Sequence, residues 1–221
     1  MSVLLFLLPC TAVTAQDILT PDAFFARLSD AYRDIQDYTA DLTITVEKEV
    51  MKGKLYHKKP NLLRIDFTEP QEQVIAMNGQ TLTVYLPKYQ VTLVQALRVQ
   101  SPATQAALAT REGLALLKQG YHITFLKDPT PVPLEPDSKE MVVKLKLIWK
   151  TTDQGFRQID LSVGTDGLIR RIVGITTDYR QVQMDYVNIQ KNQNIPEGRF
   201  TYDAPPTANM ITDFLGFSAE N

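Results

Sequence analysis

The chain has 221 residues, of which 44 % are hydrophobic and 22 % are charged. This composition is typical of a globular protein with a substantial apolar core, and the length suits a single large domain. The formal net charge is −2 and the pI is near 5.7, so the overall basic excess that nucleic-acid-binding proteins usually carry is missing. These values argue against a nucleic-acid partner.

Residues 1–15 contain no charged residue and have the features of a secretion signal. The apolar run at residues 3–8 is too short to span a bilayer, and Val13-Thr14-Ala15 fits a small-residue cleavage site. The basic segment that usually opens a signal peptide is missing, which a start codon assigned too far downstream would explain. We expect a signal peptide at residues 1–15, a single domain at residues 16–221, and export.

Cys10 is the only cysteine, and it lies inside this leader. Removal of the leader leaves a mature chain without thiols, which excludes thiol catalysis, disulfides and cysteine-bound metals. An alternative is that Cys10 is lipidated. Leu7-Leu8-Pro9-Cys10 superficially resembles a lipoprotein cleavage box, although a proline before the cysteine fits it poorly.

An amphipathic helix is predicted to begin at Thr20-Pro21-Asp22. Threonine suits the N-cap, proline the first helical position and aspartate the positive end of the helix dipole. Apolar residues follow at helical spacing: Phe24, Phe25, Leu28, Ala31, Tyr32 and Ile35. Two interpretations stay open, because the apolar face either packs on a sheet or also lines a space for a ligand.

The next segments predict an antiparallel meander. Residues 38–50 alternate as one strand, with Ala40, Leu42, Ile44 and Val46 on the buried face. Shorter strands are expected at residues 54–57, 62–67, 73–77, 81–86 and 89–97. Asn78-Gly79 predicts a type I′ turn with two residues at positive φ. Pro60 and Pro70 belong at strand ends, because proline cannot donate to a central ladder.

A second helical region is predicted at residues 103–119, ended by Gly120 and weakened by Gly113 into two short helices or a kink. Strands follow at residues 121–126, 141–150, 156–163, 168–177 and 180–189, with a hairpin turn at Asp166-Gly167 and a proline-rich exposed excursion at 128–137. Residues 199–206 are expected to be extended and residues 209–217 to dock. About ten hairpin-connected strands must curl or close, and the helices can cover the concave face over a hydrophobic ligand.

The usual signatures of enzymes are missing from the sequence. No nucleophile elbow, P-loop or dinucleotide fingerprint is present, and His57 and His122 are interpreted as strand residues. Asp160, Asp166 and Asp178 are interpreted as solvated positions and turn formers. We therefore predict that the protein is not an enzyme and needs no metal or cofactor.

The face of residues 141–150 that is not apolar carries a basic stripe formed by Lys144, Lys146 and Lys150. A solvated sheet face explains this pattern, because exposed strand positions are commonly charged. The alternative is a docking patch for an acidic partner or headgroup.

Several motifs in order resemble the bacterial outer-membrane lipoprotein-carrier family, the LolA type. They extend over nearly all of the predicted mature chain. They are Gly53-x-Leu55, Lys58-Lys59-Pro60-Asn61-x-x-Arg64, Glu69-Pro70, Asn78-Gly79-x-x-Leu82-x-x-Tyr85-x-Pro87, Asp166-Gly167-x-Ile169 and Phe200-x-Tyr202-x-x-Pro205-Pro206.

The resemblance implies a mainly β fold with helices: an unclosed, strongly curved antiparallel β-barrel of about ten to eleven strands, with the helices as a lid over an apolar cavity. It implies a monomeric periplasmic carrier that shields lipoprotein acyl chains between the inner and outer membranes. The implied partners are lipoproteins, an inner-membrane ABC-type lipoprotein-releasing transporter and an outer-membrane acceptor.

The resemblance also implies the lipid-binding residues. Many members carry an arginine before the proline that matches Pro60, and it ties the barrel mouth to the lid. Lys59 stands there, so the charge is kept but the planar fork of donors is lost. The cavity candidates are Phe24, Phe25, Leu28, Tyr32, Ile44, Val46, Leu55, Leu63, Ile65 and Phe67. Plain core packing is the alternative for each of them.

Other functions on the same fold remain open. One is an envelope-stress sensor that binds a lipid or a mislocalised lipoprotein. A second is a membrane-anchored acceptor, which needs a lipidated Cys10. A third is a periplasmic lipid- or glycolipid-binding protein, because apolar cavities discriminate poorly between chains.

Overall fold

The computed structural model describes residues 19–97 and 109–214, which form one 13-stranded sheet with two α-helices. The strand order is β13-β6-β5-β4-β3-β2-β1-β12-β11-β10-β9-β7, and β8 pairs with β9. All pairs are antiparallel except β13 with β6. The strand bounds are β1 Asp37–Val46, β2 Glu49–Lys58, β3 Leu62–Glu69, β4 Val74–Asn78, β5 Thr81–Leu86, β6 Val91–Ala96, β7 Tyr121–Phe125, β8 Val132–Pro133, β9 Met141–Trp149, β10 Phe156–Gly164, β11 Ile169–Thr176, β12 Gln181–Lys191 and β13 Asn209–Thr212.

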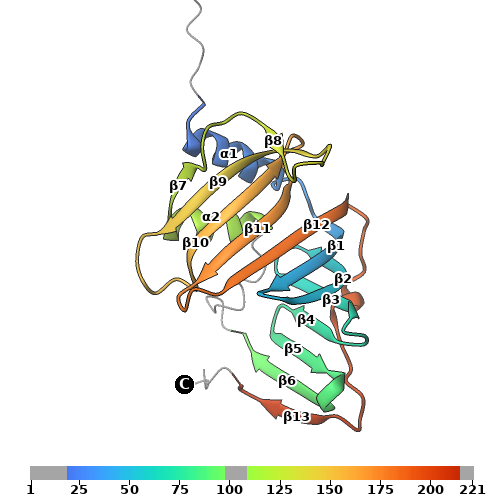
Figure 1. Cartoon of the computed structure of the whole chain (residues 1–221). Coiled ribbons are helices and arrows are strands. Elements are labelled where there is room, and N and C mark those ends of the chain that lie inside the picture. The colour runs from blue at the N-terminus through green and yellow to red at the C-terminus, as the bar shows by residue number, and fades with distance from the viewer. Residues whose placement is uncertain (1–18, 98–108, 215–221) are drawn as a thin grey trace, which may run out of the picture.

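The predicted fold class is confirmed, since the sheet is strongly curved and its end strands β7 and β13 do not pair (Figure 1). It has more strands than the ten to eleven predicted. The additional strands are β8, inside the predicted excursion, and β13, inside the predicted docking segment. No described helix is long and apolar enough to cross a membrane.

Three predictions about the strands, turns and tail are wrong. Residues 38–50 are not one strand, because the chain reverses at Glu47 and Lys48 between β1 and β2. Glu47 adopts φ 55°, and no Gly or Asn at this position or beside it indicates such a turn. In the turn after β4 only Gly79 has positive φ, whereas Asn78 ends the strand and accepts from the backbone amides of Gln80 and Thr81. The tail is not extended throughout, since Glu197–Phe200 forms a 3-10 helix, η3.

The helix α1, Pro21–Ala31, begins as predicted, because Thr20 Oγ1 accepts from the Ala23 amide at 3.2 Å. Its end packs on the β10–β11 hairpin. Gly167 there has φ +78°, and a Cβ would lie only 2.8 Å from the Ala31 Cβ. The helix α2, Arg111–Gly120, runs unbroken through Gly113, so a kink at that residue is wrong. The predicted start of this helix at residue 103 and the leader at residues 1–15 lie outside the described residues.

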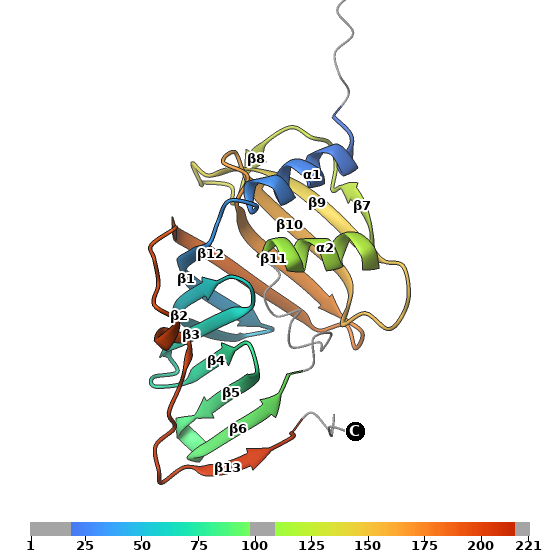
Figure 2. The same cartoon turned by 180° about the vertical axis from the view of Figure 1, so that it is seen from behind.

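The two helices lie on the same side of the sheet (Figure 2). We call this side the inner face. Strands β7, β9, β10 and β11 lie beneath α1 and α2 and form the helix-covered half. Strands β2 to β6 and β13 form the helix-free half, over whose inner face no helix of residues 19–97 or 109–214 lies. Strands β1 and β12 connect the halves.

The outer face of the helix-free half is covered by the C-terminal segment. Tyr202 and Ala208 pack against the outward side chains of Val74, Ala76 and Tyr85. Polar contacts fix the same segment, since Arg64 Nη1 donates to the carbonyls of Arg199 and Thr201, both at 3.0 Å. The C-terminal segment therefore packs on the outer face of these strands, while their inner side chains face the concave side of the sheet.

Candidate functional site

The candidate site is the continuous apolar inner face of the sheet. Strand register places apolar side chains opposite one another from strand to strand, on the face that the helices cover. One such row crosses six strands: Leu145, Leu161, Ile172, Met184, Ile44 and Met51. All of these side chains belong to or pack against one hydrophobic cluster.

Burial of the inner face decreases toward the β6 edge of the helix-free half. Leu145, Leu147 and Leu161 in the helix-covered half are fully buried at 0 % exposure. In the helix-free half, Leu63, Ile65 and Met77 are also buried. Farther along the same inner face, Ile75, Val84 and Leu93 are only half-buried. An acyl chain binds by burying apolar surface, so the half-buried positions are those at which a ligand gains most.

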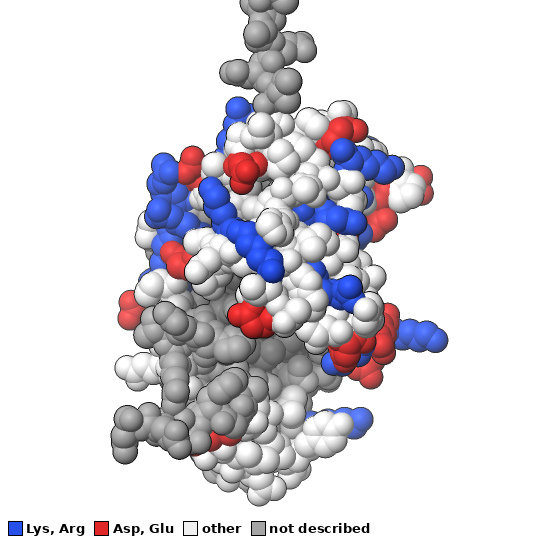
Figure 3. Space-filling model, turned by 90° about the vertical axis from the view of Figure 1, so that its left-hand side faces the viewer, with Lys and Arg blue, Asp and Glu red and all other residues white. Residues whose placement is uncertain are grey.

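Charged side chains are distributed unevenly. Strands β4, β5, β6 and β13 contain none, whereas β9 to β12 together carry both signs. In Figure 3, Lys, Arg, Asp and Glu are intermingled over the upper part of the molecule, and the white surface at the bottom carries few charges. Strands without charged side chains suit an apolar ligand, because a buried unpaired charge is costly.

A few hydrogen bonds fasten the helices to the sheet. Lys59 Nζ donates to the carbonyl of Arg33 at 2.6 Å and of Tyr32 at 3.5 Å, directly after α1. Tyr32 Oη accepts from the Ile169 amide at 3.1 Å. Tyr38 Oη donates to the carbonyl of Ala109, just before α2, at 3.0 Å. Burial raises the pKa of both tyrosines, so they remain neutral hydroxyls.

The predicted cavity residues come together. Phe25, Leu28 and Tyr32 are buried, as are Leu55, Leu63, Ile65 and Phe67, all in one cluster. Phe24 and Ile44 are partly buried against it, and Phe24 meets Phe125 edge-on with ring centroids 5.8 Å apart. Val46 is half-buried on the same face by register, where it pairs with Val182. Phe25, at 0 % exposure, is core packing in the arrangement seen here.

One inner residue was missed by motif reasoning. His57 lies on β2 two residues after Leu55, so its side chain joins the inner face, where it is 3 % exposed. Its ring lies 5.2 Å from the Tyr38 ring, between centroids. Burial, and then the nearby Lys59 charge, lowers the pKa of His57 to about 4. Within the described chain neither ring nitrogen has a hydrogen-bond partner.

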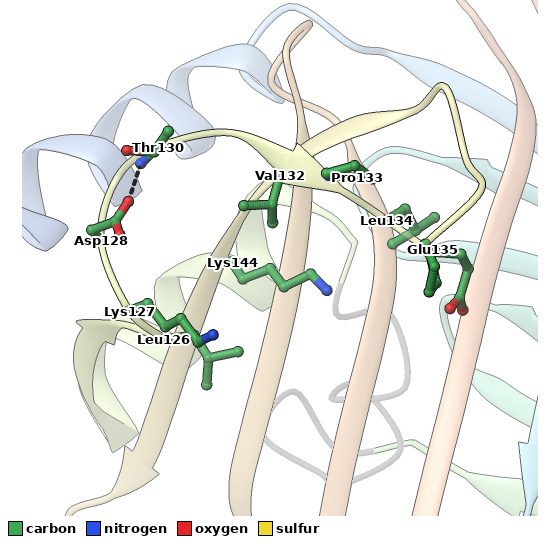
Figure 4. Close-up of a pocket in the computed structure, with 10 residues that line it drawn as sticks. Leu126, Lys127, Asp128, Thr130, Val132, Pro133, Leu134, Glu135 and Lys144 are labelled. Atoms are coloured by element: carbon green, nitrogen blue, oxygen red, sulfur yellow. Dashed lines mark hydrogen bonds between the residues drawn. The ribbon is translucent and has the colours of Figure 1, made fainter.

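A separate hollow of about 500 Å³ lies where residues 126–136 pass over β9 (Figure 4). Leu126, Val132 and Lys144 are among the residues that line it. The lysines of the predicted basic stripe therefore have different surroundings. Lys144 belongs to this hollow, whereas Lys150 Nζ donates to the carbonyls of Lys118 and Gln119 and caps α2.

Comparison with known proteins identifies the family. The family described as "Outer membrane lipoprotein carrier protein LolA" matches residues 43–203. The sequence is 25 % identical over 216 residues to the outer-membrane lipoprotein carrier protein of Hahella chejuensis, covering 95 % of this chain and 98 % of that protein. It is 26 % identical over 163 residues to the protein of the same name from Pseudomonas putida strain GB-1, covering 73 % and 72 %.

Solved structures share the fold. An uncharacterized conserved protein from Thermus thermophilus superposes with a TM-score of 0.56 at 14 % identity, covering 86 % of this chain and 98 % of that one. The complex of MucA and MucB from Pseudomonas aeruginosa contains a chain that matches with a TM-score of 0.50 at 11 % identity, covering 86 % and 62 %. With the family match over most of its length, the chain belongs to the outer-membrane lipoprotein carrier family, LolA.

Proposed function

We propose that the protein carries lipoproteins through the periplasm by enclosing their acyl chains against the inner face. The observation that carries the proposal is the half-buried, uncharged inner surface that Ile75, Val84 and Leu93 form on β4 to β6. It continues into an apolar core that two helices close, with a few hydrogen bonds between the helices and the sheet. The family membership supports the same interpretation. The chemistry is binding and release, and no covalent step is needed.

The energetics suit a carrier. Each buried CH₂ contributes about 0.8 kcal/mol, so one fully shielded acyl chain gains roughly 10 kcal/mol or more. A hydrogen bond that fastens a helix contributes only about 1 kcal/mol net. Binding of acyl chains can therefore offset the loss of these hydrogen bonds, and displacement of α1 and α2 also requires that Phe25 and Leu28 exchange their sheet contacts for lipid contacts. Release requires a receiving site that shields the chains better.

The cellular setting is part of the proposal. Residues 1–15 act as an export signal, and residues 16–221 form the working domain. An inner-membrane ABC-type transporter loads the carrier and an outer-membrane acceptor unloads it. The names of the relatives support lipoprotein cargo. A periplasmic lipid- or glycolipid-binding role, or envelope-stress sensing, is the alternative that the experiment must separate.

The test is native mass spectrometry with lipid extraction on residues 17–221 purified from a bacterial periplasm. An acylated polypeptide bound to the protein is the expected result. Phospholipid or glycolipid alone would move the function to lipid binding or sensing, and an empty protein after lipoprotein is supplied would overturn the proposal.

A matched pair of variants localises the site on β5. Val84 points to the inner face and Thr83, its neighbour, to the outer face, and both are half-buried. Val84→Glu should abolish cargo binding because it places a charge against the acyl chains. Thr83→Glu should leave binding unchanged. Equal loss in both variants would point to unfolding, which circular dichroism detects.

A further inference from the structure

His57 is a polar group in an apolar setting. It projects from β2 onto the inner face, opposite Tyr38 on β1 and Leu63 on β3, and only 3 % of it is exposed. A neutral imidazole carries one N–H donor and one acceptor nitrogen. Neither nitrogen has a partner in residues 19–97 and 109–214, whereas buried polar groups are nearly always paired.

The polar neighbours of His57 are already engaged. The Lys59 ammonium donates to the carbonyls of Tyr32 and Arg33. The buried Asp37 carboxylate accepts from the amides of Gln193, at 2.6 Å, and Ile195, at 3.0 Å. The Tyr38 hydroxyl donates to the Ala109 carbonyl. No hydrogen bond in this packing therefore requires an imidazole at position 57. An apolar side chain would fill the position without the free-energy cost of burying unpaired polar atoms.

The location of His57 links it to the helices. The Tyr38 ring that lies against it carries the hydrogen bond to the start of α2, and Lys59, two residues on, holds the end of α1. A ligand that displaces the helices must break these contacts, and the imidazole lies directly beside them.

We propose that His57 is a specificity-determining residue of the cargo site, donating its ring N–H to the carbonyl oxygen of an ester or amide that links acyl chains to their head. The inference rests on the proposed carrier function and narrows its ligand class. Hydrocarbon offers no partner to an imidazole, whereas an acyl linkage offers a strong acceptor at the end of the apolar chains. The residue thus selects acylated molecules over equally apolar ones.

The test compares two synthetic lipopeptides with the same peptide and equal chain lengths, one with ester-linked and one with ether-linked chains. An ether oxygen is a much weaker acceptor than a carbonyl. The wild-type protein should bind the ester form about tenfold more tightly, since its donor is otherwise left unpaired. His57→Leu should bind both forms equally, and His57→Gln, which keeps an N–H donor, should retain part of the preference.

The outcomes separate the two proposals. Tight and equal binding of both lipopeptides by the wild type would overturn the role of His57 and leave the carrier function standing. A preference that survives in His57→Leu would also overturn it, because the carbonyl would then be read elsewhere. Failure to bind either lipopeptide would overturn both proposals. Thermal unfolding controls for folding, and His57→Leu should unfold at a temperature no lower than the wild type.

Discussion

The two halves of the sheet share the same alternation of apolar side chains, but different layers of the protein cover them. Leu161 and Leu147 in the helix-covered half are completely buried, whereas Val84 and Leu93 in the helix-free half stay half-buried. The outer faces differ in the reverse sense, since the C-terminal segment covers Tyr85 and Ala76 from outside. Each half is thus covered by one added layer, and the half-buried inner side chains that a ligand can cover, such as Val84 and Leu93, lie on β4 to β6.

The difference teaches that burial alone does not separate core from binding surface. Phe25 and Leu28 were expected to line a ligand space, and they now fill the concavity of the helix-covered half themselves. In a carrier the helix face and the acyl chain compete for the same sheet surface. The contrast between the halves then predicts where mutations cost stability and where they cost binding.

The strongest test of the contrast between the halves is a large-to-small substitution in each of them. Leu161→Ala should lower the free energy of unfolding by about 3 kcal/mol, because it leaves a cavity at a fully buried site. Leu93→Ala should cost about 1 kcal/mol or less, because that side chain is already partly exposed. Urea unfolding measures both. Similar losses in the two variants would show that the halves do not differ as described.

The dependence of stability on pH tests the surroundings of His57, which lies on β2 next to the boundary between the halves. Burial lowers the pKa of His57 from its ordinary value of 6.5 to about 4 in the folded chain. Between these pH values the unfolded chain binds more protons, so stability falls as the pH is lowered. The loss attributable to His57 approaches about 3 kcal/mol by pH 4 and vanishes above about pH 7.

His57→Leu isolates this contribution, because the carboxylates titrate alike in both proteins. The difference in unfolding free energy between variant and wild type should widen as the pH is lowered from 7 to 4. A constant difference across this range would contradict the low pKa of His57.

Much of this fold was predictable from side-chain periodicity. The alternation of Leu63, Ile65 and Phe67 identified both the strand and its buried face, and Thr20-Pro21 marked the start of α1. The hairpin at Glu47 and Lys48 was missed because neither residue carries a turn signal and antiparallel pairing alone fixes it. Strand β13 was missed as a strand because its pairing with β6 is parallel and non-local.

The candidate site was predictable in part. Its apolar members follow from alternation, but alternation cannot tell that Phe25 would be fully buried and Ile44 only partly, since that depends on where the helices lie. His57 was interpreted as an ordinary strand residue because no metal or catalytic spacing surrounds it. Its position two residues after buried Leu55 was the available signal, and it places the imidazole on the inner face.

A smaller effect on stability tests how α1 is held on the sheet. Lys59→Met keeps the stem but removes the donor to the Arg33 carbonyl, and should cost about 1.5 kcal/mol. Hydrogen exchange should quicken in α1 and remain slow in β9 and β10. Lys59→Arg should restore slow exchange, because its fork supplies more donors to the two carbonyls. Unchanged exchange in Lys59→Met would mean that apolar packing alone holds α1.

The smallest effect distinguishes the two helices. Tyr38→Phe removes only the donor to the Ala109 carbonyl and keeps the ring against His57, so it should cost about 1 kcal/mol. Exchange should quicken in the first turn of α2 and not in α1. If acyl binding also tightens in Tyr38→Phe but not in Lys59→Met, then α2 is the helix that cargo displaces, because removing a contact of the closed state favours only a ligand that must break it.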